Sequence, residues 1–124
     1  MNEWKKLSRD CERSAQKLRD SGYLRGCVNR AYYAAYSAAT MLLLANGYTP
    51  GARREGPPHG DVLDMTGRVT SIPADRLDII SQKMRTLYKM RLDADYFAKR
   101  TIDARMAQAS LLICRSVLKE LGVT

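Results

Sequence analysis

The segment KMRLDADYFAKR, residues 89–100, contains the side chains most able to do chemistry in this sequence. A helix turns about 100° per residue, so Arg91 and Asp95 fall within about 40° of the apolar stripe that Met84 and Tyr88 begin. An ion pair on such a face must be taken out of water, which costs free energy. Two interpretations follow. Either the helix leaves the core here and the pair lies in solvent, or a fixed arginine serves a ligand in a cleft or at a subunit interface.

A second polar group lies in a segment that is otherwise apolar. At helical spacing, Arg30, Tyr33 and Ser37 share one face. An arginine in this position can pair with a carboxylate or bind phosphate. The adjacent tyrosines, Tyr32, Tyr33 and Tyr36, can stack on bases, or they can pack inside a helical bundle with their hydroxyls hydrogen-bonded. Both interpretations stay open at the level of the sequence.

His59 is the single histidine of the chain, so any histidine chemistry depends on it. It follows two prolines at the predicted start of a short helix, and Arg53 and Arg54 come shortly before it. One interpretation is that these three residues bind phosphate at a helix N-terminus, and the other is that His59 is a solvated loop residue. One histidine and three scattered cysteines make no metal-ligand set, so we expect neither a metal nor a cofactor. Glycine patterns of nucleotide-binding loops and the GxSxG nucleophile turn are missing from the sequence.

The length and amino-acid composition of the chain fit one globular domain of modest size, residues 1–124. A net charge of +8 favours polyanions, with RNA or DNA as the commonest partner, although solubility alone would also explain it. Cys11, Cys27 and Cys114 are odd in number and far apart, and they lie among apolar residues, which indicates reduced core thiols and a cytoplasmic protein. No segment is long and apolar enough to span a bilayer, so no membrane association is expected.

Apolar periodicity predicts an all-α fold, a four- to five-helix up-and-down bundle. A first helix would end at the Asp20-Ser21-Gly22 turn, and a second would cover roughly residues 23–46. Because the second helix carries no charge from Ala31 onward, we expect it at the centre of the bundle. The core stripe of the first helix would consist of Trp4, Leu7, Cys11, Ala15 and Leu18.

The second half of the chain predicts three more helical segments after a loop at residues 46–60. A short, weak helix would cover about residues 60–70, and a long one would begin after Pro73. Thr101 is the expected N-cap of the last helix. The core face of that last helix would carry Ile102, Met106, Ala109, Ile113, Val117 and Leu121.

Three pieces of the sequence, in order, resemble motifs of the prokaryotic HEPN domain family. NRAYYAAYSAATMLLLANG is similar to that family's R-x-YYA-x-[FY]-x-A helix, which runs into leucines and a closing glycine. PHG resembles the T-H-x-G turn that follows it, without the threonine and with the glycine one residue early. RLDADY resembles R-x-x-ADY. The resemblance covers roughly residues 20–120.

This resemblance implies a helical bundle that commonly forms a homodimer. The family includes metal-independent endoribonucleases, toxins of toxin–antitoxin pairs, and RNA-binding modules that accompany minimal nucleotidyltransferases. In its ribonucleases an arginine holds the scissile phosphate and a histidine transfers protons. Arg91 matches the arginine, whereas the histidine position falls at residues 96–98, which read Tyr96-Phe97-Ala98 here.

The resemblance therefore leaves the activity open between two functions. The first is an RNA-directed toxin or defence protein, with Arg91, Asp95, Tyr96 and His59 as candidate catalytic residues. Arg30, Tyr33, Arg53 and Arg54 are the candidates for binding ligand or phosphate. The second is a non-catalytic module that pairs with a nucleotidyltransferase antitoxin, for which Tyr96 is the nearest candidate acceptor of a nucleotide.

Overall fold

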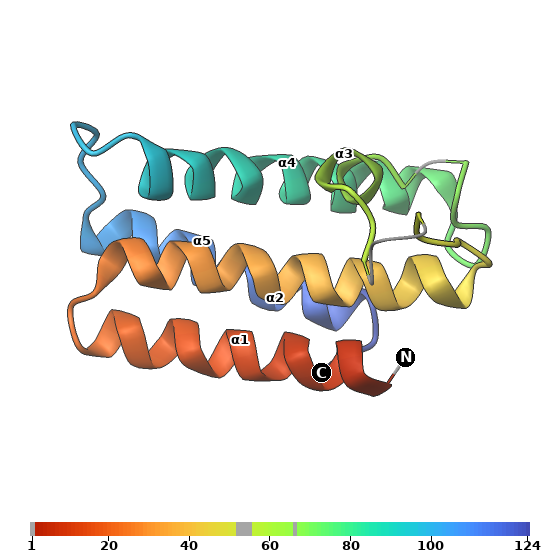
Figure 1. Cartoon of the computed structure of the whole chain (residues 1–124), viewed down its shortest axis with the longest axis horizontal. Coiled ribbons are helices and arrows are strands. Elements are labelled where there is room, and N and C mark those ends of the chain that lie inside the picture. The colour runs from red at the N-terminus through yellow and green to blue at the C-terminus, as the bar shows by residue number, and fades with distance from the viewer. Residues whose placement is uncertain (1, 52–55, 66) are drawn as a thin grey trace.

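The computed structural model describes residues 2–51, 56–65 and 67–124 (Figure 1). Within this part of the chain five helices and no strand are found, which confirms the predicted all-α fold. Their bounds are α1 (Asn2–Asp20), α2 (Leu24–Ala45), α3 (His59–Leu63), α4 (Ala74–Tyr96) and α5 (Ala104–Glu120). The four long helices run up and down beside one another (Figure 1). None of the described helices combines the length and the apolar character needed to cross a membrane.

Helix α2 lies at the centre of the bundle and packs against each of the other helices (Figure 1). The uncharged stretch that predicted this position is buried along most of its length, including Ala31, Ala35 and Ala38 with no exposed surface. Small side chains allow neighbouring backbones to approach closely. The hydroxyl of Ser8 on α1 reaches the backbone carbonyl of Ala34 on α2 at 2.7 Å, deep in this contact.

Helix α4 buries Met84, which begins the predicted apolar stripe, together with Leu77, Ile80 and Leu87. Several details differ from the prediction. Leu7 is 45% exposed, because α1 packs on α2 and α5 and turns that residue outward. The N-cap of α5 is Asp103, whose carboxylate accepts a hydrogen bond from the Met106 amide at 2.8 Å, and the predicted cap Thr101 lies outside the helix.

The buried face of α5 is also rotated from the predicted one. Val117 is buried as predicted, but Ala109 is exposed, and α5 also buries Ala107, Ser110, Leu111, Cys114 and Leu118, which were not predicted. Because α5 contacts α1, α2 and α4, it buries a wider face than a single apolar stripe. The Ser110 hydroxyl is satisfied there by the carbonyl of Ala107 at 2.7 Å, so a polar residue is tolerated inside.

The segment between α2 and α4 contains one short helix, α3, in place of the predicted helix over residues 60–70. Hydrogen bonds from the hydroxyls of two tyrosines, one on α2 and one within the segment, hold it in position. The Tyr36 hydroxyl donates to the Pro57 carbonyl at 2.6 Å, and the Tyr48 hydroxyl donates to Asp61 at 2.6 Å. These contacts place His59, the first residue of α3, against α2 and α4.

Candidate functional site

Arg91 is a buried cation on the core face of α4, 9% exposed as a residue. Its Nε donates to Oδ2 of Asp95 at 2.9 Å, four residues later, and the two side chains are 11% and 23% exposed. Arg91 is therefore buried, whereas Asp95 is exposed as a residue, so the pair lies at the edge of the core and neither wholly in solvent nor wholly inside. Burial alone would lower the pKa of Arg91, but Tyr33, Tyr96 and Asp95 together outweigh it and raise the pKa, so the guanidinium stays charged.

Three tyrosine rings surround the Arg91 guanidinium. Its central carbon lies 6.0 Å from the ring centre of Tyr32, 5.4 Å from that of Tyr33 and 5.3 Å from that of Tyr96. At these distances each ring attracts the cation. Arg91 Nη2 also donates to the Tyr96 hydroxyl at 3.3 Å. Tyr96 itself is 65% exposed, so this side of the guanidinium lies near the protein surface.

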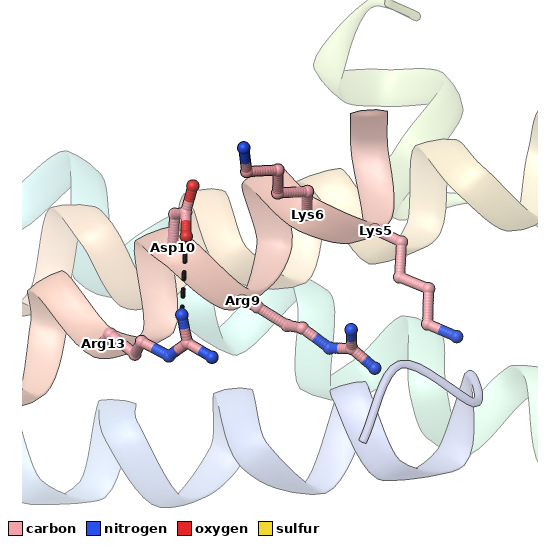
Figure 2. Close-up of a pocket in the computed structure, with 5 residues that line it drawn as sticks. All are labelled: Lys5, Lys6, Arg9, Asp10 and Arg13. Atoms are coloured by element: carbon pink, nitrogen blue, oxygen red, sulfur yellow. Dashed lines mark ion pairs between the residues drawn. The ribbon is translucent and has the colours of Figure 1, made fainter. Parts of the chain in front are cut away.

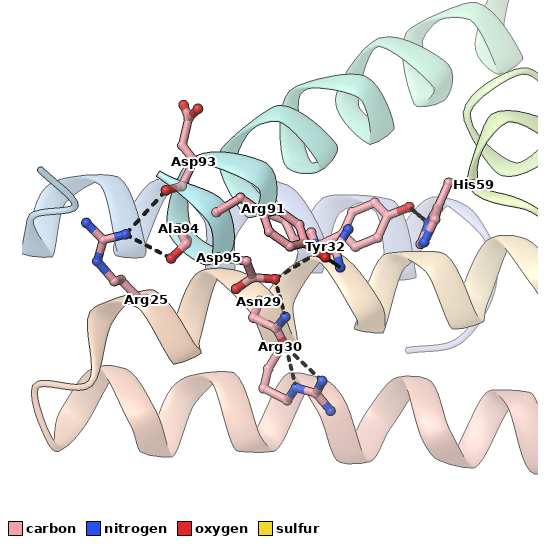
Figure 3. A network of polar contacts seen from close by, with 10 residues as sticks. Arg25, Asn29, Arg30, Tyr32, His59, Arg91, Asp93, Ala94 and Asp95 are labelled. Carbon is pink, nitrogen blue, oxygen red and sulfur yellow. Dashed lines mark hydrogen bonds and ion pairs between the residues drawn. The ribbon is translucent and has the colours of Figure 1, made fainter. Parts of the chain in front are cut away.

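Asn29 of α2 connects the Arg91 pair to the central helix (Figure 3). Its amide nitrogen donates to Asp95 Oδ2 at 2.8 Å, the same oxygen that accepts from Arg91. The amide oxygen of Asn29 accepts two hydrogen bonds from Arg30, at 2.9 and 2.7 Å. Arg30 also lies over the Tyr33 ring, 5.3 Å from its centre. Arg30 therefore reaches the Arg91–Asp95 pair through Asn29.

His59 is separated from Arg91 by one tyrosine. Its Nδ1 lies 2.7 Å from the Tyr32 hydroxyl, and the Tyr32 ring in turn is a neighbour of the Arg91 guanidinium. The rings of Tyr36 and Tyr88 lie 5.4 and 5.5 Å from the imidazole. Burial raises the pKa of Tyr32, so its hydroxyl remains protonated at neutral pH. The structure thus brings His59 to the same aromatic cluster as Arg91.

Arg25, at the start of α2, fixes the end of α4 on which the site is built (Figure 3). Its guanidinium donates to the backbone carbonyls of Asp93 at 3.3 Å, Ala94 at 2.8 Å and Phe97 at 3.3 Å. It also donates to the carbonyls of Ala98, at 3.2 Å, and Arg100. The last carbonyls of a helix lack partners within the helix, and a cation there also complements the helix dipole.

The structure therefore brings together Arg91, Asp95, Tyr96 and Tyr33. Arg30 is connected to this group through Asn29, and His59 through Tyr32. Arg53 and Arg54, the other predicted phosphate ligands, lie outside the described residues. Sequence reasoning missed Asn29 and Arg25. Asn29 had a weak signal, a polar amide beside Arg30 in the quoted motif, whereas Arg25 had none, because its partners are backbone atoms. In the part of the chain that is described, no group of three or more histidine, cysteine or acidic side chains could hold a metal ion.

Comparison with known families decides the identity of this bundle. The model of the HEPN domain matches residues 1–123. The chain belongs to the HEPN domain family. Membership supports a ribonuclease, toxin-like or nucleotide-binding function in general. No curated protein and no solved structure matches the chain significantly.

Proposed function

We propose that this HEPN protein acts on RNA, with Arg91 as the group that binds the phosphate. The observation that carries the proposal is the fixed, shielded position of its guanidinium, which Asp95 orients and three tyrosine rings surround. Among the described residues, Nη1 of Arg91 has no hydrogen-bond partner, so it can donate to a ligand. The exposed ring of Tyr96 beside it offers a face on which a base can stack.

The chemistry we propose at this site is metal-independent cleavage of RNA. The 2′-oxygen attacks the adjacent phosphorus, the bond from phosphorus to the 5′-oxygen breaks, and the products are a cyclic phosphate and a 5′-hydroxyl. One proton leaves the 2′-hydroxyl and one reaches the departing oxygen. Arg91 would stabilise the charge that develops on the phosphate, a role worth about 10²–10³ in rate for a single donor. His59 is the candidate for proton transfer, since it lies one tyrosine away from Arg91.

The test is cleavage of a fluorescent mixed-sequence RNA in the presence of a chelator. Arg91→Ala and His59→Ala should both abolish cleavage while the helical circular dichroism is kept. Arg85→Ala is the matched control, because Arg85 is an exposed arginine on the same helix but on another face. Cleavage by Arg91→Ala at the wild-type rate would refute the assignment of Arg91, and loss in Arg85→Ala would show a general charge effect instead.

A second candidate function is a module that a nucleotidyltransferase partner modifies. The observation that favours it is Tyr96, 65% exposed at the end of α4 with its hydroxyl 3.3 Å from Arg91 Nη2. The Tyr96 oxygen would attack the α-phosphorus of a nucleoside triphosphate, its proton would pass to a base of the transferase, and pyrophosphate would leave. Arg91 would attract the incoming phosphates.

Intact-mass measurement after co-expression with a minimal nucleotidyltransferase tests this second function. We expect one added nucleoside monophosphate on the wild type and none on Tyr96→Phe. An unmodified wild type would count against the idea, and a modified Tyr96→Phe would move the acceptor to another side chain.

We also propose that the protein is a homodimer. The end of α4 exposes two large aromatic side chains, Tyr96 at 65% and Phe97 at 46%, which a second copy would cover beside Arg91. Analytical ultracentrifugation should give twice the monomer mass for the wild type, and a monomer at all concentrations would contradict the proposal.

A further inference from the structure

A second concentration of positive charge lies on α1, outside the Arg91 site (Figure 2). A surface hollow of about 360 Å³ is lined there by four cationic side chains and one carboxylate, namely Lys5, Lys6, Arg9, Arg13 and Asp10. Helix α1 packs on α2 and α5, and no contact between α1 and α4 is found in the described part of the chain. Helix α2 lies between α1, which carries the hollow, and α4, which carries Arg91 (Figure 1).

Arg9 is held in place within this hollow by a neutral acceptor, and it also lines a neighbouring hollow with Glu12 and Thr124. Its Nε and Nη2 both donate to the backbone carbonyl of Val123, at 3.1 and 2.9 Å. A carbonyl is a neutral acceptor, so the positive charge of Arg9 is left for a ligand. A side chain whose position is already fixed also loses less conformational entropy when it binds.

The carboxylates near the hollow do little to cancel its charge. Asp10 reaches Arg13 at 3.8 Å, and the two side chains are 53% and 71% exposed, so this pair is weak and screened by salt. The next acidic residue along the helix, Glu12, is already paired with Arg115 of α5 at 2.8 Å. For Lys5 and Lys6 no ion pair is found among the residues that the structure describes.

We propose that this α1 surface, which we define as Lys5, Lys6, Arg9 and Arg13, binds the phosphates of an RNA backbone on the side of the bundle away from Arg91. Lys5, Arg9 and Arg13 are spaced four residues apart, so they form a row that rises about 6 Å per step. A regular row of cations suits a ligand whose negative charges also repeat regularly. The inference rests on the proposed function for its choice of RNA.

The lining of the hollow favours RNA over an acidic protein. All five lining residues are charged, and none is aromatic or aliphatic. Protein interfaces are usually organised around a buried apolar or aromatic anchor, whereas contacts to phosphate need only lysine, arginine and other hydrogen-bond donors. Phosphate contacts carry no sequence information, so this surface would hold RNA of any sequence.

The experiment is an anisotropy titration of a labelled, mixed-sequence, single-stranded RNA at several salt concentrations. The RNA carries 2′-O-methyl groups, because these remove the attacking hydroxyl and prevent cleavage during the measurement. The test variant is Lys5→Gln combined with Arg13→Gln, which leaves the Arg9–Val123 contact intact. The matched control is Arg105→Gln combined with Lys119→Gln, which removes the same charge from exposed positions on α5.

We expect the α1 variant to bind roughly tenfold more weakly at 0.1 M salt, and its slope of log K against log salt to be shallower by about 1.4. The α5 control should stay close to the wild type. An α1 variant that matches the control in both quantities would overturn the proposal. A labelled polyglutamate peptide serves as the second ligand, and an α1 variant that loses this peptide but keeps RNA would also overturn it, in favour of an acidic protein partner.

The same measurements separate this inference from the proposed function. Loss of cleavage in Arg91→Ala with unchanged binding by the α1 variant refutes the α1 surface alone. Weaker binding by the α1 variant with full cleavage by Arg91→Ala supports the α1 surface and refutes the Arg91 site. A wild type that binds no RNA at all refutes both.

Discussion

A single carboxylate oxygen of Asp95 accepts hydrogen bonds from side chains of two helices, α4 and α2, and these bonds fix the position of the Arg91 guanidinium. Oδ2 receives Nε of Arg91 from its own helix and the amide of Asn29 from α2. Taking a charged pair out of water is unfavourable unless such additional hydrogen bonds compensate. The hydrogen bond from Asn29 therefore offsets part of the free-energy cost of keeping the Arg91 cation among aromatic rings.

The first prediction concerns Asn29 and is tested by thermal and urea unfolding. Asn29→Ala removes the hydrogen bond to Asp95 and the two from Arg30, and should cost at least about 1.5–3 kcal/mol, the usual worth of one hydrogen bond to a charged group. Asn29→Asp should cost more at pH 7, because a second carboxylate would then face Asp95. Equal stability of both variants at pH 7 would contradict the role given to this contact.

The site was predictable from the sequence only where it depends on one helix. Helical periodicity predicts that Arg91 lies on the core face of α4, where it is buried, whereas Asp95, predicted on the same face, is exposed as a residue. The contact between Tyr32 and His59 does not follow, because a long connection whose path no periodicity defines brings the two together. The role of Asn29 depends in the same way on how α2 and α4 are paired.

At the scale of elements, the segment before α3 is held close to α1 and α2. A side-chain Cβ added at Gly56 would lie 2.7 Å from the Tyr36 hydroxyl and 3.0 Å from the Trp4 ring, which is closer than packed atoms approach. Glycine at this position therefore allows the segment to reach Tyr36, and through it to set the position of His59.

The second prediction follows from this close approach. Gly56→Ala should displace the segment, weaken the hydrogen bond from Tyr36 to Pro57, and change the environment of His59. Gly60→Ala is the control, since no atom lies within 4 Å of a Cβ at that glycine. The imidazole signals of His59 in NMR spectra should shift in Gly56→Ala and stay near their wild-type positions in Gly60→Ala. Equal shifts in both variants would refute the packing argument.

The third prediction concerns Arg25 and the end of α4. Arg25→Gln should lower the free energy of unfolding by about 1–3 kcal/mol, because several backbone carbonyls lose a charged donor. Amide hydrogen exchange over residues 93–100 should become faster, while exchange in α1 should change little. Arg25→Lys should rescue only part of the loss, since an ammonium keeps the charge but cannot reproduce the planar fork. Arg105→Gln on the surface of α5 serves as the control, and an equal effect there would contradict the prediction.

The order and identity of the long helices were predictable, but some of their details were not. Periodicity and turn residues located α1, α2 and α4, since each of them has a clear stripe or a clear break. Most of the buried face of α5 was not predicted, because that helix contacts three neighbouring helices and so buries more than one apolar stripe. It also buries Ser110, a polar residue that an apolar pattern does not include. Thr101 and Asp103 are both good cap residues in isolation, and only the path of the chain selects Asp103.

At the scale of the whole molecule, the core keeps several groups in their neutral form. Burial raises the pKa of the Cys114 thiol to about 12, and burial also raises the pKa of Cys11, Cys27 and Tyr32. In the unfolded chain a thiol ionises near pH 8.5, while the folded chain holds its proton. The stability contributed by the thiols is therefore fully present below about pH 8.5, and that contributed by Tyr32 below about pH 10; each contribution is lost as the pH rises toward the folded value.

The fourth prediction is that the free energy of unfolding falls between pH 8.5 and 11, by up to about 1.4 kcal/mol per pH unit for each such group. Urea unfolding at a series of pH values measures this decline. In Cys114→Ala the decline should be shallower, although the variant is less stable at pH 7 because of the space left in the core. A decline as steep as that of the wild type would show that Cys114 does not contribute.

The edge contact between Trp4 and Tyr36 has a practical consequence. Trp4 is the only tryptophan in the sequence, and its ring centre lies 6.2 Å from that of Tyr36, the residue that holds Pro57. The indole therefore emits light from beside the segment that carries His59, and tyrosines excited nearby can transfer their energy to it. The protein thus contains its own fluorescent probe. Intrinsic emission can report, without any added label, whether that segment stays docked when RNA or a partner protein binds.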